Sequence, residues 1–228
     1  MRAVIFANGI LSDPQAAWKS VQPGDLVIAA DGGARHCRDI GIRPDVLIGD
    51  LDSTGEELVT AFEAAGTRVL RYPARKDFTD LELALQFARD QDIREVLVLG
   101  ALGGRWDQTL ANLLLPAAAD LSSLRISLVD GPQEILLLRA GEKPEVHHRL
   151  EIRGLPGDTV SLVPLGGDAC GVTTLGLEYP LQRGRLPFGA TLGISNVLLE
   201  NQASVELEEG ILLCVIIHQA QSETERRE

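Results

Sequence analysis

The sequence predicts an α/β domain with a doubly wound, mainly parallel sheet, followed by an all-β sandwich domain. Residues 1–125 alternate short, nearly continuous apolar runs with segments of helical period, which is typical of parallel strands covered on both faces. Residues 126–218 carry many short apolar runs separated by turns rich in Gly and Pro, which favours an antiparallel sandwich or barrel. The charged segment 219–228 has no apolar period, and we expect it to be disordered.

The expected strands of the first domain are, in order, AVIFAN (3–8), DLVIAA (25–30), DVLIG (45–49), TRVLRY (67–72) and EVLVLG (95–100). Two helices are predicted from apolar stripes of helical period. One stripe comprises Leu81, Leu85 and Ala88, and the other comprises Leu110, Leu113, Leu114 and Ala117. The expected strand regions of the all-β domain are 126–132, 134–144, 150–158, 159–167, 171–177, 189–195, 203–210 and 211–218.

The composition excludes several classes of protein. A net charge of -12 argues against a nucleic-acid partner, because little in the chain would neutralise phosphates along a duplex. No apolar run approaches the roughly 20 residues of a membrane helix, so we expect no membrane partner. The three cysteines lack metal-ligand spacing and suit a reducing cytoplasm, where we expect the protein. The pair His147–His148 has no Cys or acidic neighbour at ligand spacing and is expected on the surface.

Polar residues gather where the predicted parallel strands end. In an open parallel sheet, ligands bind outside the carboxyl ends of the strands, which face one edge. In chain order, these strand ends carry Asn8, Gly9, Asp31, Gly32, Gly33, Asp50, Asp52, Lys76, Asp77, Thr79, Asp80, Gly104, Arg105, Asp107 and Gln108. We therefore expect a polar site at this edge of the sheet.

Helix capping is the simpler explanation for each carboxylate taken alone. Ser53 with Glu56, and Thr79 with Glu82, match the capping-box pattern, and Asp107 is placed to cap a third helix. Capping does not require carboxylates in pairs, however, and so many on one edge would repel one another unless a cation were bound. Mg²⁺ is the natural candidate, since a few carboxylates hold it together with waters and substrate phosphates.

Two glycine-rich segments, DGGARH and GALGGRW, offer backbone N–H groups near helix N-termini, where phosphate oxygens bind. The chain contains neither a Walker sequence with Gly-Lys-Ser or Gly-Lys-Thr nor the Gly-x-Gly-x-x-Gly fingerprint of dinucleotide-binding proteins. The residues by themselves thus indicate a metal–nucleotide site that is not a P-loop.

More specific motifs occur in both halves of the chain. The first half contains DGGARH, GIRPDVLIGDLDS, KDFTDLELAL and GALGGRWDQTLANLLL, and the second contains SLVPLG, GVTTLGLEYPL and GATLGISN. Together, and in this order, they resemble the motifs of the thiamine pyrophosphokinase family. The resemblance implies an α/β catalytic domain and a thiamine-binding β-sandwich, assembled as a homodimer with active sites at the subunit interface. The implied reaction moves diphosphate from ATP to the hydroxyl of thiamine and gives thiamine diphosphate and AMP.

The resemblance also implies roles for individual residues. The implied catalytic residues are Asp52, Asp80, Arg105 and Asp107, and the implied Mg²⁺ ligands are Asp50, Asp52 and Asp80. The implied ATP contacts are Asn8, Asp31, Gly32, Gly33, Asp77, Thr79, Gly104 and Gln108. The implied thiamine contacts are Thr173, Thr174, Tyr179, Ser195 and Asn196, with Tyr179 stacked on a ring of the substrate. Either Asp80 or Asp107 would accept the proton of the attacking hydroxyl.

The chain departs from the family pattern at a few positions. Val197 stands where many bacterial members carry an acidic residue, and Trp106 and Gln108 stand where they often carry Leu and His. Three rival interpretations are a pyrophosphokinase for a pterin alcohol, a metal-dependent glycosyl- or nucleotidyltransferase, and a protein that binds a thiamine compound or nucleotide without turnover. The second-half motifs favour thiamine over a pterin. The KDFTD and GGRWD segments have no use in a sugar transferase, and the intact carboxylates speak against a non-catalytic binder.

Overall fold

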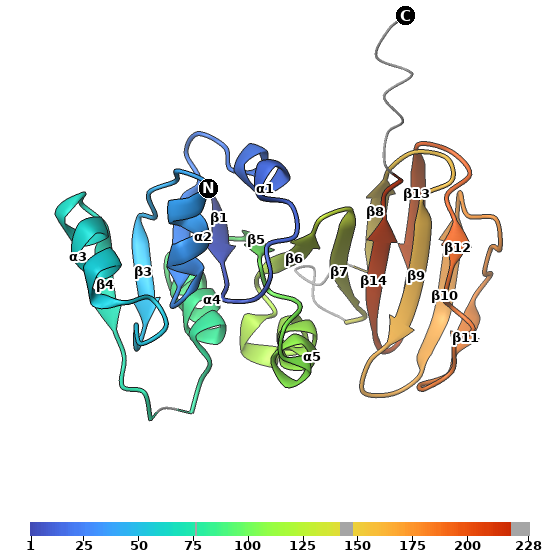
Figure 1. The fold of residues 1–228 in the computed structure, drawn as a ribbon. Helices are drawn as coiled ribbons and strands as arrows, with labels where there is room; N and C mark the ends of the chain where they lie inside the picture. Colours follow the sequence, from blue (N-terminus) through green and yellow to red (C-terminus); the bar gives the residue numbers. More distant parts are fainter. Residues whose placement is uncertain (76, 142–147, 220–228) are drawn as a thin grey trace, which may run out of the picture. The chain divides into compact units, whose positions relative to one another are not determined.

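The computed structural model describes residues 1–75, 77–141 and 148–219. The chain divides into two compact units, Met1–Gly131 and Pro132–Glu228 (Figure 1). Lys76, His147 and all but the first residue of the tail expected to be disordered lie outside the described residues, and His148 is exposed. None of the helices in the described ranges has the length and apolar composition needed to cross a membrane.

The first unit is built on parallel strands in the order β6-β5-β1-β2-β3-β4. The strands are β1 (Arg2–Phe6), β2 (Leu26–Ala30), β3 (Val46–Gly49), β4 (Arg68–Arg71), β5 (Glu95–Leu99) and β6 (Arg125–Asp130). The chain moves outward from β1 to β4 and then returns to β5 on the other side of β1, so the strand order reverses next to β1. The predicted doubly wound sheet is confirmed, and its ligand-binding crevice is expected at this reversal.

Helices pack on the sheet between these strands: α1 (Pro14–Ser20), α2 (Gly33–Asp39), α3 (Glu56–Ala64), α4 (Asp80–Asp90) and α5 (Trp106–Leu114). Short 3₁₀ turns at Leu115–Ala117 and Ala119–Leu121 follow α5. Because side chains alternate along a strand, Val4 and Phe6 share one core, which α1, α2 and α3 join. Helix α4 contacts β1, β2 and β3. The apolar stripe predicted for α4 is confirmed, since all its members are buried.

Two of the three predicted helix caps are wrong. At the start of α3 the N-cap position belongs to Gly55, and the Ser53 hydroxyl instead donates to Asp52 Oδ1 at 3.1 Å. At the start of α5 the N-cap residue is Arg105, and Asp107 lies one residue inside the helix. The third cap is confirmed, because Thr79 precedes α4 and its hydroxyl accepts from a backbone N–H of the first turn at 3.2 Å.

The second unit contains two packed antiparallel sheets, which confirms the predicted all-β sandwich. One sheet comprises β12 (Asn196–Val197), β9 (Thr159–Pro164), β14 (Ile211–Ile217) and β7 (Gln133–Arg139). The other comprises β11 (Gly184–Leu186), β10 (Ala169–Leu175), β13 (Gln202–Glu206) and β8 (Arg149–Arg153). Buried apolar side chains from both sheets form a single core, among them Val160, Leu212, Ile152, Val172 and Val205.

One predicted strand is absent, and two others differ from expectation in burial or in domain. Segment 189–195, expected as a strand, forms turns, and β11 and β12 flank it instead. Strand β4 is covered less than expected, since its residues are exposed or half-buried, as befits the edge of a sheet. The run 126–132 was expected in the all-β domain, and this is wrong: it supplies β6, which pairs parallel with β5 and extends the parallel sheet of the first unit.

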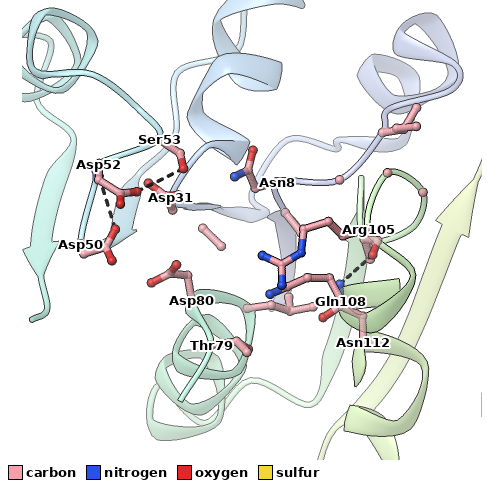
Figure 2. Close-up of a pocket in the computed structure, with 18 residues that line it drawn as sticks. Asn8, Asp31, Asp50, Asp52, Ser53, Thr79, Asp80, Arg105, Gln108 and Asn112 are labelled. Atoms are coloured by element: carbon pink, nitrogen blue, oxygen red, sulfur yellow. Dashed lines mark hydrogen bonds between the residues drawn. The ribbon is translucent and has the colours of Figure 1, made fainter. Parts of the chain in front are cut away.

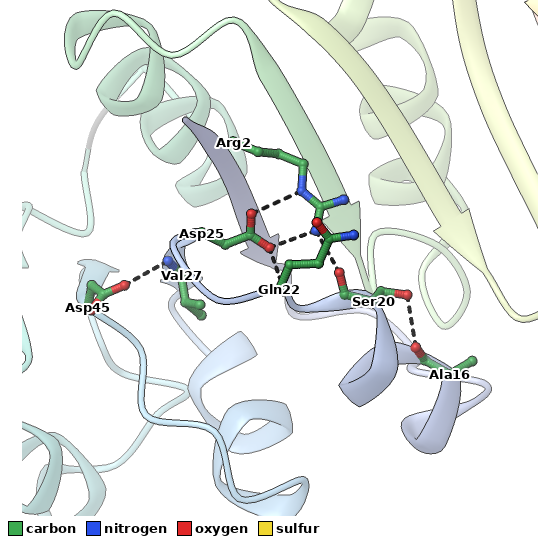
Figure 3. Close-up of polar contacts among 7 residues, drawn as sticks. All are labelled: Arg2, Ala16, Ser20, Gln22, Asp25, Val27 and Asp45. Atoms are coloured by element: carbon green, nitrogen blue, oxygen red, sulfur yellow. Dashed lines mark hydrogen bonds and ion pairs between the residues drawn. The ribbon is translucent and has the colours of Figure 1, made fainter.

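A polar cluster fixes the amino ends of β1 and β2, opposite to the carboxyl ends (Figure 3). Arg2 Nη2 donates to Asp25 Oδ2 at 2.6 Å and to the carbonyl of Ser20 at 2.7 Å, and Arg2 Nε donates to Asp25 Oδ1 at 3.1 Å. Burial alone would raise the pKa of Asp25, but the hydrogen bonds from Arg2 and from the N–H of Gln22 bring that pKa below its ordinary value. The carboxylate is therefore stabilised in its charged form.

We expect Asp25→Asn to lower the free energy of unfolding at pH 7 by about 1 to 3 kcal/mol, the usual contribution of a charged hydrogen bond. A lowered folded-state pKa gives stability that is present above the unfolded pKa of about 4 and lost as the pH falls through the folded value. The difference from wild type should therefore shrink between pH 7 and pH 3 in urea titrations. The control is Asp39→Asn, which removes an exposed pair with Arg38 and should change little. An equal loss in both variants would contradict the assignment.

Candidate functional site

The carboxyl ends of the parallel strands surround a cavity of about 580 Å³ (Figure 2). Its walls come from the loops after β1, β2, β3 and β5 and from the first turns of α4 and α5. Most of the residues that the sequence placed at this edge line it: Asn8, Asp31, Asp50, Asp52, Thr79, Asp80, Gly104, Arg105 and Gln108. Gly9 also lines the cavity, whereas Gly32, Gly33, Asp77 and Asp107 are described but do not line it.

Three carboxylates converge on one side of the cavity. Asp31, Asp50 and Asp52 each offer an oxygen within 4.8 Å of the others, a spacing that a shared cation can bridge. Asp31 is buried, Asp50 is half-buried and Asp52 is exposed. The Asp52 N–H donates to Asp50 Oδ1 at 3.3 Å, and the buried Thr54 hydroxyl donates to Asp31 Oδ1 at 3.2 Å. Thr54 was not among the expected site residues, because nothing in its sequence neighbourhood points to Asp31.

Asp80 approaches the same side of the cavity from the first turn of α4. A Cβ at Gly49 would lie 3.1 Å from Asp80 Oδ1 and 3.0 Å from the Cβ of Asp31, so glycine at this strand end lets the two carboxylates come close. The implied metal set was Asp50, Asp52 and Asp80. The cluster within bridging distance contains Asp31, with Asp80 beside it.

Arg105 and Asp107 form an exposed ion pair at the other side of the cavity. Arg105 Nε donates to Asp107 Oδ1 at 3.1 Å, and its Nη2 donates to Oδ2. The hydrogen bond from Arg105 holds the pKa of Asp107 below its ordinary value, and the same bond raises the pKa of Arg105. Asp107 is therefore a weaker proton acceptor while Arg105 is bound to it.

Two buried polar residues of α5 hold the glycine-rich loop that precedes this helix. The Gly103 N–H donates to Thr109 Oγ1 at 3.1 Å, and Asn112 Nδ2 donates to the carbonyl of Ala101 at 2.6 Å. The prediction that the leucine stripe forms the buried face of α5 is wrong, since Leu110 is 58% and Leu114 is 45% exposed. The signal that sequence analysis missed is the spacing of Thr109 and Asn112, three residues apart, which puts both on one helix face.

The predicted glycine pair after β2 is required by close packing. A Cβ at Gly33 would overlap the carbonyl of Phe6, and a Cβ at Gly32 would overlap the amide of Asn8. Glycine therefore lets the start of α2 reach the end of β1 and the Asn8 side chain. This contact joins the loops after β1 and β2 into one wall of the cavity.

The expected thiamine contacts lie in the second unit and form two groups. Asn196 Oδ1 accepts from the Tyr179 N–H at 3.0 Å, Asn196 Nδ2 donates to the Tyr179 carbonyl at 2.8 Å, and Tyr179 is 66% exposed. Ser195 adjoins this pair and has a left-handed φ of 61°. Thr174 is buried, and its hydroxyl accepts from the N–H of Leu181, so it supports the loop that carries Tyr179.

Thr173 belongs to a different part of the second unit. It lines a cavity of about 500 Å³ together with His148, Arg149 and residues of β13 and the following turn, and neither Tyr179 nor Asn196 lines that cavity. Its hydroxyl accepts from the Arg183 N–H at 3.2 Å.

Comparison with known families assigns the chain. The family model for the catalytic domain of thiamin pyrophosphokinase matches residues 17–128, and the model for its vitamin B1 binding domain matches residues 147–212. The thiamine pyrophosphokinase of Bacillus subtilis (strain 168) is 31% identical over 193 residues, which cover 83% of this chain and 86% of the relative. The chain belongs to the thiamin pyrophosphokinase family.

Other members of the family match over most of their length and share the fold. Thiamine pyrophosphokinase 1 of Arabidopsis thaliana is 29% identical over 214 residues, which cover 84% of this chain and 78% of the relative. The crystal structure of the Bacillus subtilis protein superposes with a TM-score of 0.83 at 28% identity, covering 96% of this chain and 100% of that one. The solved structure of thiamin pyrophosphokinase from Candida albicans has a TM-score of 0.73 at 20% identity. The match covers 95% of this chain and 88% of that one, and it supports the fold.

The departures from the thiamin pyrophosphokinase pattern can now be placed. Gln108 lines the cavity, where its amide can donate or accept a hydrogen bond but cannot exchange a proton. Val197 lies on β12, opposite Thr159 of β9, and its N–H donates to Asn196 Oδ1 at 2.9 Å. The backbone at this position thus helps to hold Asn196, whichever side chain is present.

We expect Thr109→Val to loosen the glycine-rich loop, because the Gly103 N–H loses its acceptor while the side-chain volume is kept. Hydrogen exchange at the Gly103 amide should quicken by about three- to tenfold, the equivalent of one hydrogen bond. Thr60→Val, the same substitution at an exposed position of α3, is the matched control and should leave this amide unchanged. Unaltered exchange in Thr109→Val would mean that the loop does not depend on α5.

Proposed function

We propose that this protein is an ATP:thiamine diphosphotransferase, which moves diphosphate from ATP to the hydroxyl of thiamine and releases AMP. The observation that carries the proposal is the match of both family models in one chain. The catalytic model spans most of the acidic cavity, and the vitamin B1 model spans Tyr179 and Asn196. We propose that the first unit, Met1–Gly131, carries catalysis and ATP binding and that the second unit carries thiamine binding.

The acidic side of the cavity fits a divalent cation, because three carboxylates from the loops after β2 and β3 lie within bridging distance. We propose that Asp50 and Asp52 hold Mg²⁺, with Asp80 or Asp31 close enough to contribute through water. When bound, Mg²⁺ would neutralise the charge of the phosphates and align the diphosphate for transfer. Carboxylate oxygens are hard ligands, which favours Mg²⁺ over a thiophilic metal.

The phosphates are proposed to lie between the acidic side of the cavity and Arg105. Arg105 can donate two parallel hydrogen bonds to phosphate oxygens once it leaves Asp107. Asp80 or Asp107 would accept the proton of the thiamine hydroxyl as the new bond to phosphorus forms. The further residues proposed to contact ATP are Asn8, Asp31, Gly32, Gly33, Asp77, Thr79, Gly104 and Gln108.

We propose that thiamine binds at Tyr179, Ser195 and Asn196, with the loop of Tyr179 supported by Thr174. Thr173 remains a proposed thiamine contact, although it lines a separate cavity. The exposed aromatic face of Tyr179 suits the cationic thiazolium ring, and Asn196 fixes the backbone of Tyr179 from both sides. We further propose a homodimer whose active sites lie between subunits. Support comes from large apolar side chains left uncovered in both units: Trp106, Leu110, Leu175, Phe188, Leu192 and Leu199.

We also propose a cytoplasmic location. All three cysteines are unpaired, as expected for a reducing compartment. Burial raises the pKa of Cys37 and raises that of Cys214 to about 12, so neither thiol is reactive at neutral pH.

Incubation of the purified protein with ATP, Mg²⁺ and thiamine should give AMP and thiamine diphosphate in equal amounts, separated by chromatography. We expect Asp52→Asn to lower turnover by about 100-fold or more, since metal-ion catalysis contributes several kcal/mol. Asp90→Asn, which removes an exposed carboxylate paired with Arg89, is the control and should retain activity. Near-normal turnover of Asp52→Asn at saturating Mg²⁺ would refute the metal assignment. Formation of ADP and thiamine monophosphate would refute the proposed transfer.

Tyr179→Ala should raise the KM for thiamine by about three- to thirtyfold, the equivalent of a desolvated cation–π contact, and leave the KM for ATP nearly unchanged. Tyr179→Phe keeps the aromatic face and should restore most of the affinity.

Subunit sharing is tested by mixing unfolded Asp52→Asn and Tyr179→Ala chains and refolding them together. If each site draws on both subunits, mixed dimers regain one intact site, and about a quarter of the wild-type activity returns at low thiamine. No recovery would place both residues in one subunit's site.

A further inference from the structure

Helix α2 holds the loop that follows β1 through two adjacent side chains. Arg35 Nη2 donates to Asn8 Oδ1 at 3.0 Å. His36 Nε2 lies 2.9 Å from the carbonyl of Gly9 and donates to it, since a carbonyl can only accept. The Gly9 N–H in turn donates to the carbonyl of Gly100 at 2.7 Å. The backbone next to Asn8 is thus held both by the loop after β5 and by α2. Only the orientation of the Asn8 side-chain amide is left to be set.

The contacts of the Asn8 amide restrict that adjustment. The amide lies against Gly32, where even a Cβ would overlap it, so it is packed on one side by backbone. A guanidinium has only donors, so the amide oxygen must face Arg35. The amide nitrogen is therefore turned away from Arg35. Figure 2 shows it directed toward the side of the cavity that Asp31 and Ser53 line.

We propose that Arg35 is a positioning residue: it orients the Asn8 amide so that its two N–H groups donate to phosphate oxygens of the nucleotide. The proposal rests on the proposed use of ATP. The opposite orientation would turn the amide oxygen toward a cavity wall that already carries Asp31, Asp50 and Asp52, and toward phosphates that can only accept. With Arg35 in place, the Asn8 amide already has the donor orientation before the nucleotide binds. Binding therefore loses no free energy to the ordering of this side chain.

A double-substitution cycle tests this assignment. Arg35→Met keeps the aliphatic stem but removes the donors, and Asn8→Ala removes the amide. We expect Arg35→Met to raise the KM for ATP about three- to tenfold, the equivalent of one hydrogen bond. The KM for thiamine and kcat should change less than twofold, a split that a general loss of structure would not give. Arg35→Lys, which also only donates, should recover part of the ATP affinity.

The cycle separates positioning from a direct role. If Arg35 acts through Asn8, the double variant Asn8→Ala/Arg35→Met should bind ATP no more weakly than Asn8→Ala alone. Effects that multiply would show that Arg35 attracts the phosphates by its own charge, and would overturn the proposal. An unchanged KM in Arg35→Met would also overturn it. Arg38→Met is the matched control, because Arg38 lies on the same helix and pairs with the exposed Asp39.

Binding of Mg·ATP to the same variants, measured by calorimetry, tests the role of Arg35 separately from the proposed reaction. If the wild-type protein binds Mg·ATP but forms no thiamine diphosphate, the proposed reaction fails while the binding cycle still decides the role of Arg35. If the wild-type protein does not bind Mg·ATP, both proposals fail.

Discussion

The parallel pairing of β1 with β2 on one side and β5 on the other is the constraint on which the cavity depends. Hydrogen bonding continues beyond the strands, since the Ile10 N–H donates to the carbonyl of Leu102 at 2.8 Å and the Asp31 N–H to that of Ile48 at 2.8 Å. The loops after β1, β2, β3 and β5 therefore leave the sheet in register. Backbone pairing places the polar residues of these loops at one edge, and their side-chain contacts refine the arrangement afterwards.

This arrangement has a cost that the fold alone does not explain. Asp31 and Leu51 have left-handed φ values of 44° and 66°, conformations that cost about 1 to 3 kcal/mol for residues other than glycine. Asp31 is also only 5% exposed, although Asp50 and Asp52 lie close by. The hydrogen bond from Thr54 offsets part of this cost. Glycine or asparagine would make the same turn without a charge, and an aspartate at this position agrees with the proposed role of Asp31 in ligand binding.

The sequence was most informative where chemistry depends on topology. The rule that parallel strands end at one edge placed Asp31, Asp50 and Asp80 correctly. The edge at which a loop lies depends on the direction of its strand, and the order of the strands does not change it. It failed where tertiary contacts choose between equivalent local patterns. The leucines of α5 have a convincing period, but the loop carbonyl and N–H groups at Ala101 and Gly103 draw the Thr109–Asn112 face inward. A capping box, likewise, cannot reveal that Ser53 will bond to Asp52, since that choice depends on the path of the turn.

In the proposed mechanism, the ion pair of Arg105 and Asp107 links phosphate binding to the choice of proton acceptor. Both side chains are largely exposed, at 71% and 66%, and exposed pairs contribute little stability, so phosphate oxygens can replace Asp107 as the partner of Arg105. While the pair persists, the hydrogen bond from Arg105 keeps the pKa of Asp107 low, and Asp107 is a poor base. Release of Arg105 removes the largest of the causes that lower this pKa, although backbone hydrogen bonds still lower it. Under the proposed mechanism, Asp107 would therefore accept a proton more readily after the nucleotide is bound than before.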